Sequence, residues 1–156
     1  MSALQDLYPD DFAHCYGCGR LNSHGLHVRS EWRDGEAVAR FTPASYHIAM
    51  PGFVYGGLIA SLIDCHAMAT AAGASMVATG LRPGEDITPR FVTASLQVDY
   101  VRPTPTGEEL TLRSRAADVS DRKVTVHVEL FAAGVQCARG KVLAVRRPST
   151  MDAPPR

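Results

Sequence analysis

Residues 51–74 read PGFVYGGLIASLIDCHAMATAAGA, a stretch in which Asp64 is the only charged residue. Its larger apolar side chains recur with the spacing of one face of a helix, at Tyr55, Leu58, Ile59, Leu62 and Ile63. This pattern predicts a long helix from Val54 to about Ala74, entered through Pro51-Gly52. The small residues at 67–74 would let that helix lie very close to a sheet or another helix.

Length and charge place this helix in a single globular domain. The chain has 156 residues, which is long enough to bury a core and fold without a metal or disulfides. It has 16 Lys and Arg against 16 Asp and Glu. A zero net charge argues against a dedicated nucleic-acid or anionic-membrane surface. The apolar run 53–63 is too short to span about 30 Å of hydrocarbon, and Asp64 would be costly inside it. We therefore expect a buried helix, no nucleic-acid partner and no membrane segment.

The remaining periodic segments alternate with period two, as strands do. A hairpin is predicted from 26–32 and 37–41 around Asp34-Gly35, and four further strands are predicted at 94–101, 110–119, 123–130 and 136–145. Short, turn-rich connections favour antiparallel neighbours. The order of hairpin, helix and four strands predicts an α+β fold with the helix on one face of the sheet.

Three segments follow from this division. Residues 1–24 are expected to form an irregular N-terminal segment, 25–147 the folded domain, and 148–156 a disordered tail with three prolines. Four cysteines without a signal-peptide pattern favour a reducing, cytoplasmic location and no disulfides.

Asp64 is the first candidate for catalysis. Carboxylates are rarely buried unless they are paired, and no Lys or Arg lies three or four residues away on this helix. Its nearest helical neighbour with a hydrogen-bonding side chain is Ser61. An isolated acid in an apolar helix is suited to act as a general base.

Tyr55-Gly56-Gly57 is the second candidate. Backbone N–H groups in the first turn of a helix are unpaired and lie at the positive end of the helix dipole, which suits them to bind a developing oxyanion. Glycine would let a substrate carbonyl approach these groups; alternatively, it serves only tight packing.

The spacing of the two candidates predicts a dimer. Asp64 lies eight residues after Gly56, roughly 12 Å along a helix, whereas a base and an oxyanion donor must both lie within about 3 Å of the reacting centre or its water. If both are catalytic, Gly56 of one protomer must approach Asp64 of a symmetry mate.

The motif 51–64, the strand LQVDYVRP at 96–103 and the turn at Gly107 resemble the hotdog-fold acyl-CoA thioesterases, in particular the phenylacetate-pathway (PaaI-like) group. The resemblance covers residues 12–146 and implies an antiparallel sheet wrapped around one long central helix. It also implies an acyl-CoA substrate, no metal or redox cofactor, and a homodimer or homotetramer with sites at the interface.

By this resemblance, Gly56 would supply the oxyanion-hole N–H and Asp64 would be the general base or nucleophile. Thr93 would help to position the water. We expect Tyr55, Gly57, His47 and Ser61 to contact substrate. Two positions depart from the family pattern, because Tyr55 replaces the usual His, and Ala49 stands where some relatives have a polar residue, a role that His47 would have to take over.

The N-terminal CxxC, Cys15 and Cys18, is the candidate metal motif. A lone CxxC is weak evidence for a zinc site, since structural zinc is bound by four ligands in a recognisable spacing. We expect an ordered loop that lines the substrate pocket, and well under one zinc per chain. Cys65 and Cys137 are expected to be small buried hydrophobes, and His66 a hydrogen-bonded or interfacial histidine.

The predicted function is thioester hydrolysis of an acyl-CoA. Two alternatives stay open: a non-catalytic module that binds an acyl-CoA or an acyl carrier, favoured by Tyr55 and Ala49, and a hotdog dehydratase or hydratase. The last would need an Asp/His pair, and Asp64 and His66 do not share a helix face. Arg82, Arg90, Arg102, Arg146 and Arg147 are unranked candidates for binding the phosphates of coenzyme A.

Overall fold

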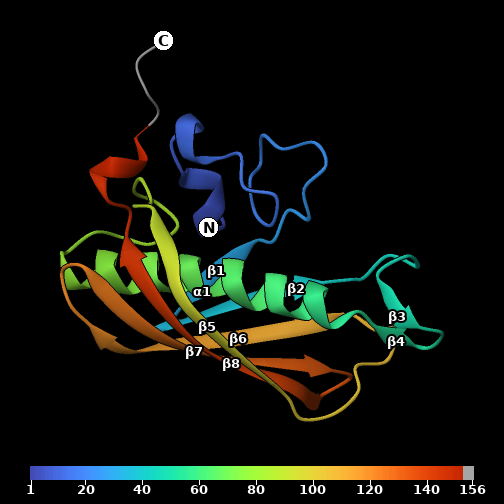
Figure 1. Cartoon of the computed structure of the whole chain (residues 1–156). Coiled ribbons are helices and arrows are strands. Elements are labelled where there is room, and N and C mark those ends of the chain that lie inside the picture. The colour runs from blue at the N-terminus through green and yellow to red at the C-terminus, as the bar shows by residue number, and fades with distance from the viewer. Residues whose placement is uncertain (153–156) are drawn as a thin grey trace.

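The computed structural model of the chain describes residues 1–152. In it one helix, α1 (Gly56–Ala78), packs against a six-stranded antiparallel sheet (Figure 1). The sheet has the order β1-β2-β6-β7-β8-β5. Its strands are β1 (Ser30–Arg33), β2 (Glu36–Phe41), β5 (Phe91–Tyr100), β6 (Leu110–Val119), β7 (Lys123–Ala132) and β8 (Val135–Arg146). The predicted architecture of one helix on one face of an antiparallel sheet is confirmed.

The ends of α1 follow from local backbone conformation. Tyr55, just before the helix, is extended at φ −60° and ψ 127°. Beyond the C-terminus, Gly80 has φ 79°, and the N–H of Leu81 donates to Met76 O at 2.8 Å. The helix therefore ends at Ala78 rather than Ala74, because nothing before Gly80 breaks it.

Glycines allow α1 to approach its neighbours closely. A Cβ on Gly140 of β8 would lie 2.5 Å from Ile63 Cγ2, and one on Gly73 would lie 2.5 Å from Trp32 Cε3. Both distances are shorter than a real carbon contact, so only glycine fits without a shift.

By length and composition α1 would also be able to cross a membrane, yet 72% of its most apolar window is buried within the fold.

The first hairpin is shorter than predicted. Asp34 and Gly35, with φ 49° and 81°, form its turn as expected. The strand before it begins at Ser30 rather than Leu26, because the N–H groups of Leu26 and Val28 donate to the carbonyls of Tyr16 and Gly17 instead of to β2.

The other predicted strands are confirmed with small shifts at their ends. β7 shows the predicted alternation most clearly, with Val124, Val126, Val128 and Leu130 buried.

The sequence did not predict a second, two-stranded sheet of β3 (Ile48–Met50) and β4 (Phe53–Val54). Pro51-Gly52, expected to lead into the helix, forms the turn of this hairpin, and its strands are too short to show a period.

The N-terminal segment lies on the side of α1 that faces away from the sheet (Figure 1). It contains the 3-10 turns η1 (Leu4–Leu7) and η2 (Asp10–Phe12), and the Gln5 amide donates to Ser30 Oγ at 2.9 Å. The C-terminal tail forms a third turn, η3 (Ser149–Met151), and residues 153–156 of the predicted disordered tail lie outside the described residues.

Candidate active site

The first turn of α1 presents two backbone N–H groups without an acceptor. Among residues 1–152, the N–H groups of Gly56 and Gly57 make no backbone hydrogen bond, and no side chain caps the helix. Tyr100, at the end of β5, lies beside them and donates its hydroxyl to Gly56 O at 2.7 Å. These free donors at the positive end of the helix dipole are suited to bind a developing oxyanion.

An apolar groove of about 410 Å³ opens beside this turn. Gly56 lies in its wall, and the larger lining side chains are Met50, Phe53, Ile59 and Tyr100. The one charged side chain in the lining is Arg102, which donates to Gln136 O at 3.0 Å. A concave, mostly apolar site of this size is typical of a small-molecule pocket.

Tyr55 folds back over the start of the helix. A Cβ on Gly57 would lie 2.4 Å from Tyr55 Cζ, so the second glycine makes room for the phenol ring. The Tyr55 N–H donates to His47 O at 3.0 Å and ties the preceding loop to the helix. Contact of Tyr55 and Gly57 with substrate stays a prediction.

His47 lies in the loop before β3, outside the groove lining. Its Nδ1 accepts a hydrogen bond from the Ala44 N–H at 2.9 Å, and its ring packs edge-on against Tyr46. Ala49, in contrast, lines the groove. Within one chain, His47 therefore does not occupy the position that Ala49 leaves without a polar group.

Asp64 and Thr93 form the second part of the candidate site. Asp64 is half-buried on α1, and the Thr93 hydroxyl from β5 donates a hydrogen bond to Asp64 Oδ1. Burial raises the pKa of Asp64 above its ordinary value, while the hydrogen bond from Thr93 opposes that rise. Thr93 thus holds the Asp64 side chain through Oδ1, and within residues 1–152 no hydrogen bond engages Oδ2.

Two other polar residues of α1 make contacts within the fold. The Ser61 hydroxyl donates to Gly57 O at 2.8 Å within the helix, so it does not orient Asp64. His66 is fully buried, with its ring nitrogens 2.8 Å from Ser30 Oγ and from Ser114 Oγ. Burial lowers the pKa of His66 to about 4. The prediction of a hydrogen-bonded core histidine is confirmed.

The two parts of the site are separate within one chain. Asp64 is eight residues beyond Gly56 in one continuous helix, roughly 12 Å away, and neither Asp64 nor Thr93 lines the groove. β5 joins them, because Thr93 near its start contacts Asp64 and Tyr100 at its end contacts Gly56.

The sequence did not reveal a role for Tyr100 or the groove, and it did not single out Arg102 among the five candidate arginines. Tyr100 was visible only as an aromatic at the end of a predicted strand, and Arg102 as one of five unranked arginines. The groove also needs β3 and β4, which the sequence did not reveal.

A family model described as the thioesterase superfamily matches residues 51–138. Among curated proteins, the acyl-coenzyme A thioesterase THEM4 of Xenopus laevis is 36% identical over 87 residues, which make up 56% of this chain and 33% of that protein. The chain thus spans about a third of the length of this relative.

Solved structures share the fold. A thioesterase superfamily protein from Shewanella loihica PV-4 is 43% identical, with a TM-score of 0.68, and the match covers 89% of this chain and 98% of that one. The PaaI protein of the E. coli phenylacetic acid degradation operon is 16% identical, with a TM-score of 0.64, over 79% of this chain and 81% of that one. The second likeness concerns the fold alone.

Proposed function

The chain belongs to the thioesterase superfamily, and from this premise we propose that it hydrolyses an acyl-coenzyme A thioester to the free acid and coenzyme A. The observation that carries the proposal is the pair of unpaired N–H groups at Gly56 and Gly57, beside an apolar groove. The curated relative named as an acyl-coenzyme A thioesterase supports coenzyme A as the carrier.

In the proposed reaction, the Gly56 N–H binds the thioester oxygen as negative charge develops on it. Asp64 of the facing protomer either takes a proton from the attacking water or attacks the carbonyl carbon itself. In the first route the water oxygen bonds to the carbonyl carbon, the carbon–sulfur bond breaks, and the coenzyme A thiolate takes up the proton that Asp64 had accepted. In the second route the carbon–sulfur bond breaks as Asp64 and the acyl group form a mixed anhydride, and a water molecule then hydrolyses this anhydride, which releases the acid, restores the carboxylate and supplies the proton for the thiolate. Thr93 is a positioning residue, because its hydroxyl holds the Asp64 carboxylate.

The groove supports binding of the substrate's apolar parts. Met50, Phe53 and Ile59 offer apolar contacts to an acyl group or to the pantetheine arm. Arg102 is the arginine that lines this groove, so among the five candidates we assign it to the phosphates of coenzyme A.

We further propose that the chain forms a homodimer through β5, either alone or as half of a homotetramer. β5 is an edge strand, with β8 as its sheet neighbour within the described chain. Antiparallel pairing of two copies around a two-fold axis near Leu96 and Gln97 would bring Thr93 of one copy opposite Tyr100 of the other. Because these residues contact Asp64 and Gly56, the same axis would unite both parts of the site.

Replacing Leu96 with Asp is expected to give a folded monomer that hydrolyses acyl-CoA at least about 100-fold more slowly, since in a monomer no Asp64 from a facing protomer lies beside the Gly56 oxyanion donor. Leu96 is 39% exposed in the single chain, so the fold of one copy tolerates the charge. In a dimer, the two carboxylates introduced by the substitution would lie near each other at the two-fold axis and repel. Light scattering and a thiol-release assay measure the two effects.

The matched control is Val119→Asp, at a strand residue that is 45% exposed and lies on β6, away from the proposed axis. It should keep the mass and activity of the wild type. A Leu96→Asp protein that is monomeric yet fully active would contradict the composite site, and one that stays dimeric would contradict the β5 interface.

A panel of acyl-CoA substrates tests the activity itself. Thiol release across aliphatic and aromatic acyl groups is expected for at least one class of substrate. The second candidate function, a non-catalytic acyl-CoA-binding module, rests on Tyr55 and Ala49, the two residues that depart from the pattern implied by the family resemblance. Ligand-dependent stabilisation without hydrolysis across the whole panel would favour that module and overturn the proposed hydrolysis.

A further inference from the structure

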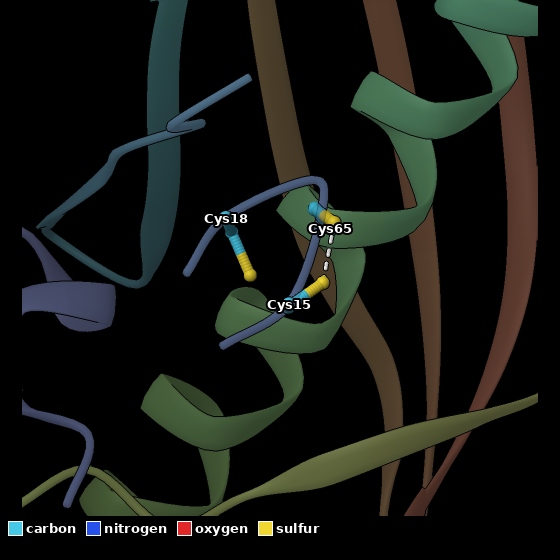
Figure 2. Close-up of side chains that lie close together, drawn as sticks. All are labelled: Cys15, Cys18 and Cys65. Carbon is cyan, nitrogen blue, oxygen red and sulfur yellow. Dashed lines mark hydrogen bonds between the residues drawn. The ribbon is translucent and has the colours of Figure 1, made fainter. Parts of the chain in front are cut away.

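Three cysteine thiols lie close together, as Figure 2 shows. Cys15 and Cys18 come from the N-terminal loop and Cys65 from α1, and their Sγ atoms all lie within 4.8 Å of one another. The Cys15 and Cys65 sulfurs are 3.8 Å apart. Cys18 and Cys65 are buried and Cys15 is half-buried. The fold thus adds to the CxxC motif a third thiol from a distant part of the sequence.

The loop is shaped to reach Cys65. A Cβ on Gly17 would lie 2.2 Å from Cys65 Sγ, and one on Gly19 would lie 2.4 Å from the backbone nitrogen of Cys15. The Gly19 N–H donates to Cys15 O at 2.7 Å, and the Val28 N–H donates to Gly17 O at 2.9 Å. Glycine is therefore required on both sides of Cys18 for the loop to hold its thiols against the helix.

The spacing of the Cys15 and Cys65 sulfurs fits a shared metal ion, and the Cys18 sulfur lies within 4.8 Å of both. Zinc–thiolate bonds of about 2.3 Å in a tetrahedron place two sulfurs about 3.8 Å apart, which is the distance between Cys15 and Cys65. A disulfide would need about 2.05 Å. Three thiols are also the soft ligands that select zinc over magnesium or calcium.

A half-buried arginine, Arg90, supports a negatively charged complex. Arg90 lies over the Tyr8 ring, with its Cζ 5.0 Å from the ring centroid. Burial lowers the pKa of Arg90, but Tyr8 and the three cysteines, in their ionised forms, raise it above its ordinary value. Its Nη1 is buried without a hydrogen-bond partner among the described residues. Three thiolates and a divalent ion carry one net negative charge, which a guanidinium balances.

We propose that Cys15, Cys18 and Cys65 bind one Zn²⁺ ion through three thiolates, with water as the fourth ligand. Within residues 1–152, no His, Asp, Glu or further Cys joins the three thiols to supply a protein fourth ligand. Binding releases the thiol protons and fastens the N-terminal loop to α1 next to Asp64. The expectation of no zinc rested on a CxxC without further ligands, and Cys65 supplies a third thiol.

Elemental analysis of the full-length protein, purified with a thiol reductant and without chelator and then incubated with Zn²⁺, tests this site. About one zinc per chain is expected. The Cys65→Ser variant should bind zinc more than about 100-fold more weakly, since losing an outer-sphere partner alone costs 10–100-fold. Cys137→Ser is the matched control, because Cys137 is also a buried free cysteine but lies in β8 outside the cluster.

Two further measurements keep the test decisive if Cys65→Ser folds poorly. Gly17→Ala keeps all three thiols yet forces the loop away from Cys65, so it should also weaken zinc binding. A chelator should lower the Tm of the wild type and of Cys137→Ser.

Three outcomes would overturn the proposal. They are well under one zinc per chain in the presence of excess Zn²⁺, equal zinc affinity in Cys65→Ser, and a Cys15–Cys65 disulfide, seen as a loss of two hydrogens by mass, in protein prepared without added oxidant.

Discussion

Replacing Asp64 with Asn is expected to lower kcat for a good acyl-CoA substrate by about 10²–10⁴-fold, because the variant keeps the shape of the side chain and removes the base. This loss corresponds to about 3–5 kcal/mol of transition-state stabilisation. Thr93 donates its hydroxyl to Asp64 Oδ1, and an Asn oxygen accepts the same hydrogen bond, so the orientation is preserved. Thiol-release kinetics on the wild type and the variant measure the effect.

Stability provides the check that this loss is chemical. Asp64 is half-buried, and burial raises its pKa, so a neutral amide at this position should not lower the Tm. Asp118→Asn, at an exposed carboxylate of β6, is the matched control and should keep full activity. Unchanged turnover in Asp64→Asn would reject Asp64 as base or nucleophile.

Replacing Gly56 with Pro is expected to lower kcat by about 10²–10³-fold by deleting one oxyanion donor, with little change in the fold. Proline is favoured at the first position of a helix, where its missing N–H is not needed. Tyr55 already has the extended backbone that a following proline requires, with φ −60° and ψ 127°. Steady-state kinetics should show the loss mainly in kcat.

Gly56→Ala is the control, because it keeps the N–H and its methyl group would meet the Tyr100 ring at an ordinary 3.4 Å. It should be at least about 10-fold more active than Gly56→Pro if the N–H is the donor. Equal losses in the two variants would assign the effect to the shape of the helix start instead.

Mixing the two inactive proteins distinguishes a composite site from a site within one chain. In a heterodimer of Gly56→Pro and Asp64→Asn, one of the two composite sites has both native residues. Random exchange of protomers should therefore restore about a quarter of wild-type activity. No recovery, with exchange verified by mass, would place Gly56 and Asp64 in the same site of one chain.

Local sequence patterns were sufficient for the elements and for the residues that stand out within them. The helical spacing of residues 55–63 and the alternation of 123–130 predicted α1 and β7, since burial of one face imposes these periods. Asp64 was identified because an unpaired charge is costly to bury in an apolar helix, so its presence there indicates a function.

Contacts between distant segments were beyond such patterns. The Thr93 hydrogen bond to Asp64 crosses from β5 to α1, and the Tyr100 contact with Gly56 joins the other end of β5 to the start of the helix. The resemblance to a family named Thr93 as a site residue, but the residues alone did not place it.

The sequence by itself determined one buried helix with a glycine pair at its start and a single acid eight residues later, because helical geometry fixes that spacing. Only the tertiary structure decided which groups surround them: the groove under β3 and β4, the edge strand that links both parts of the site, and the third thiol beside Cys15 and Cys18. These features depend on contacts between segments that are far apart along the chain, and local periodicity does not reveal such contacts.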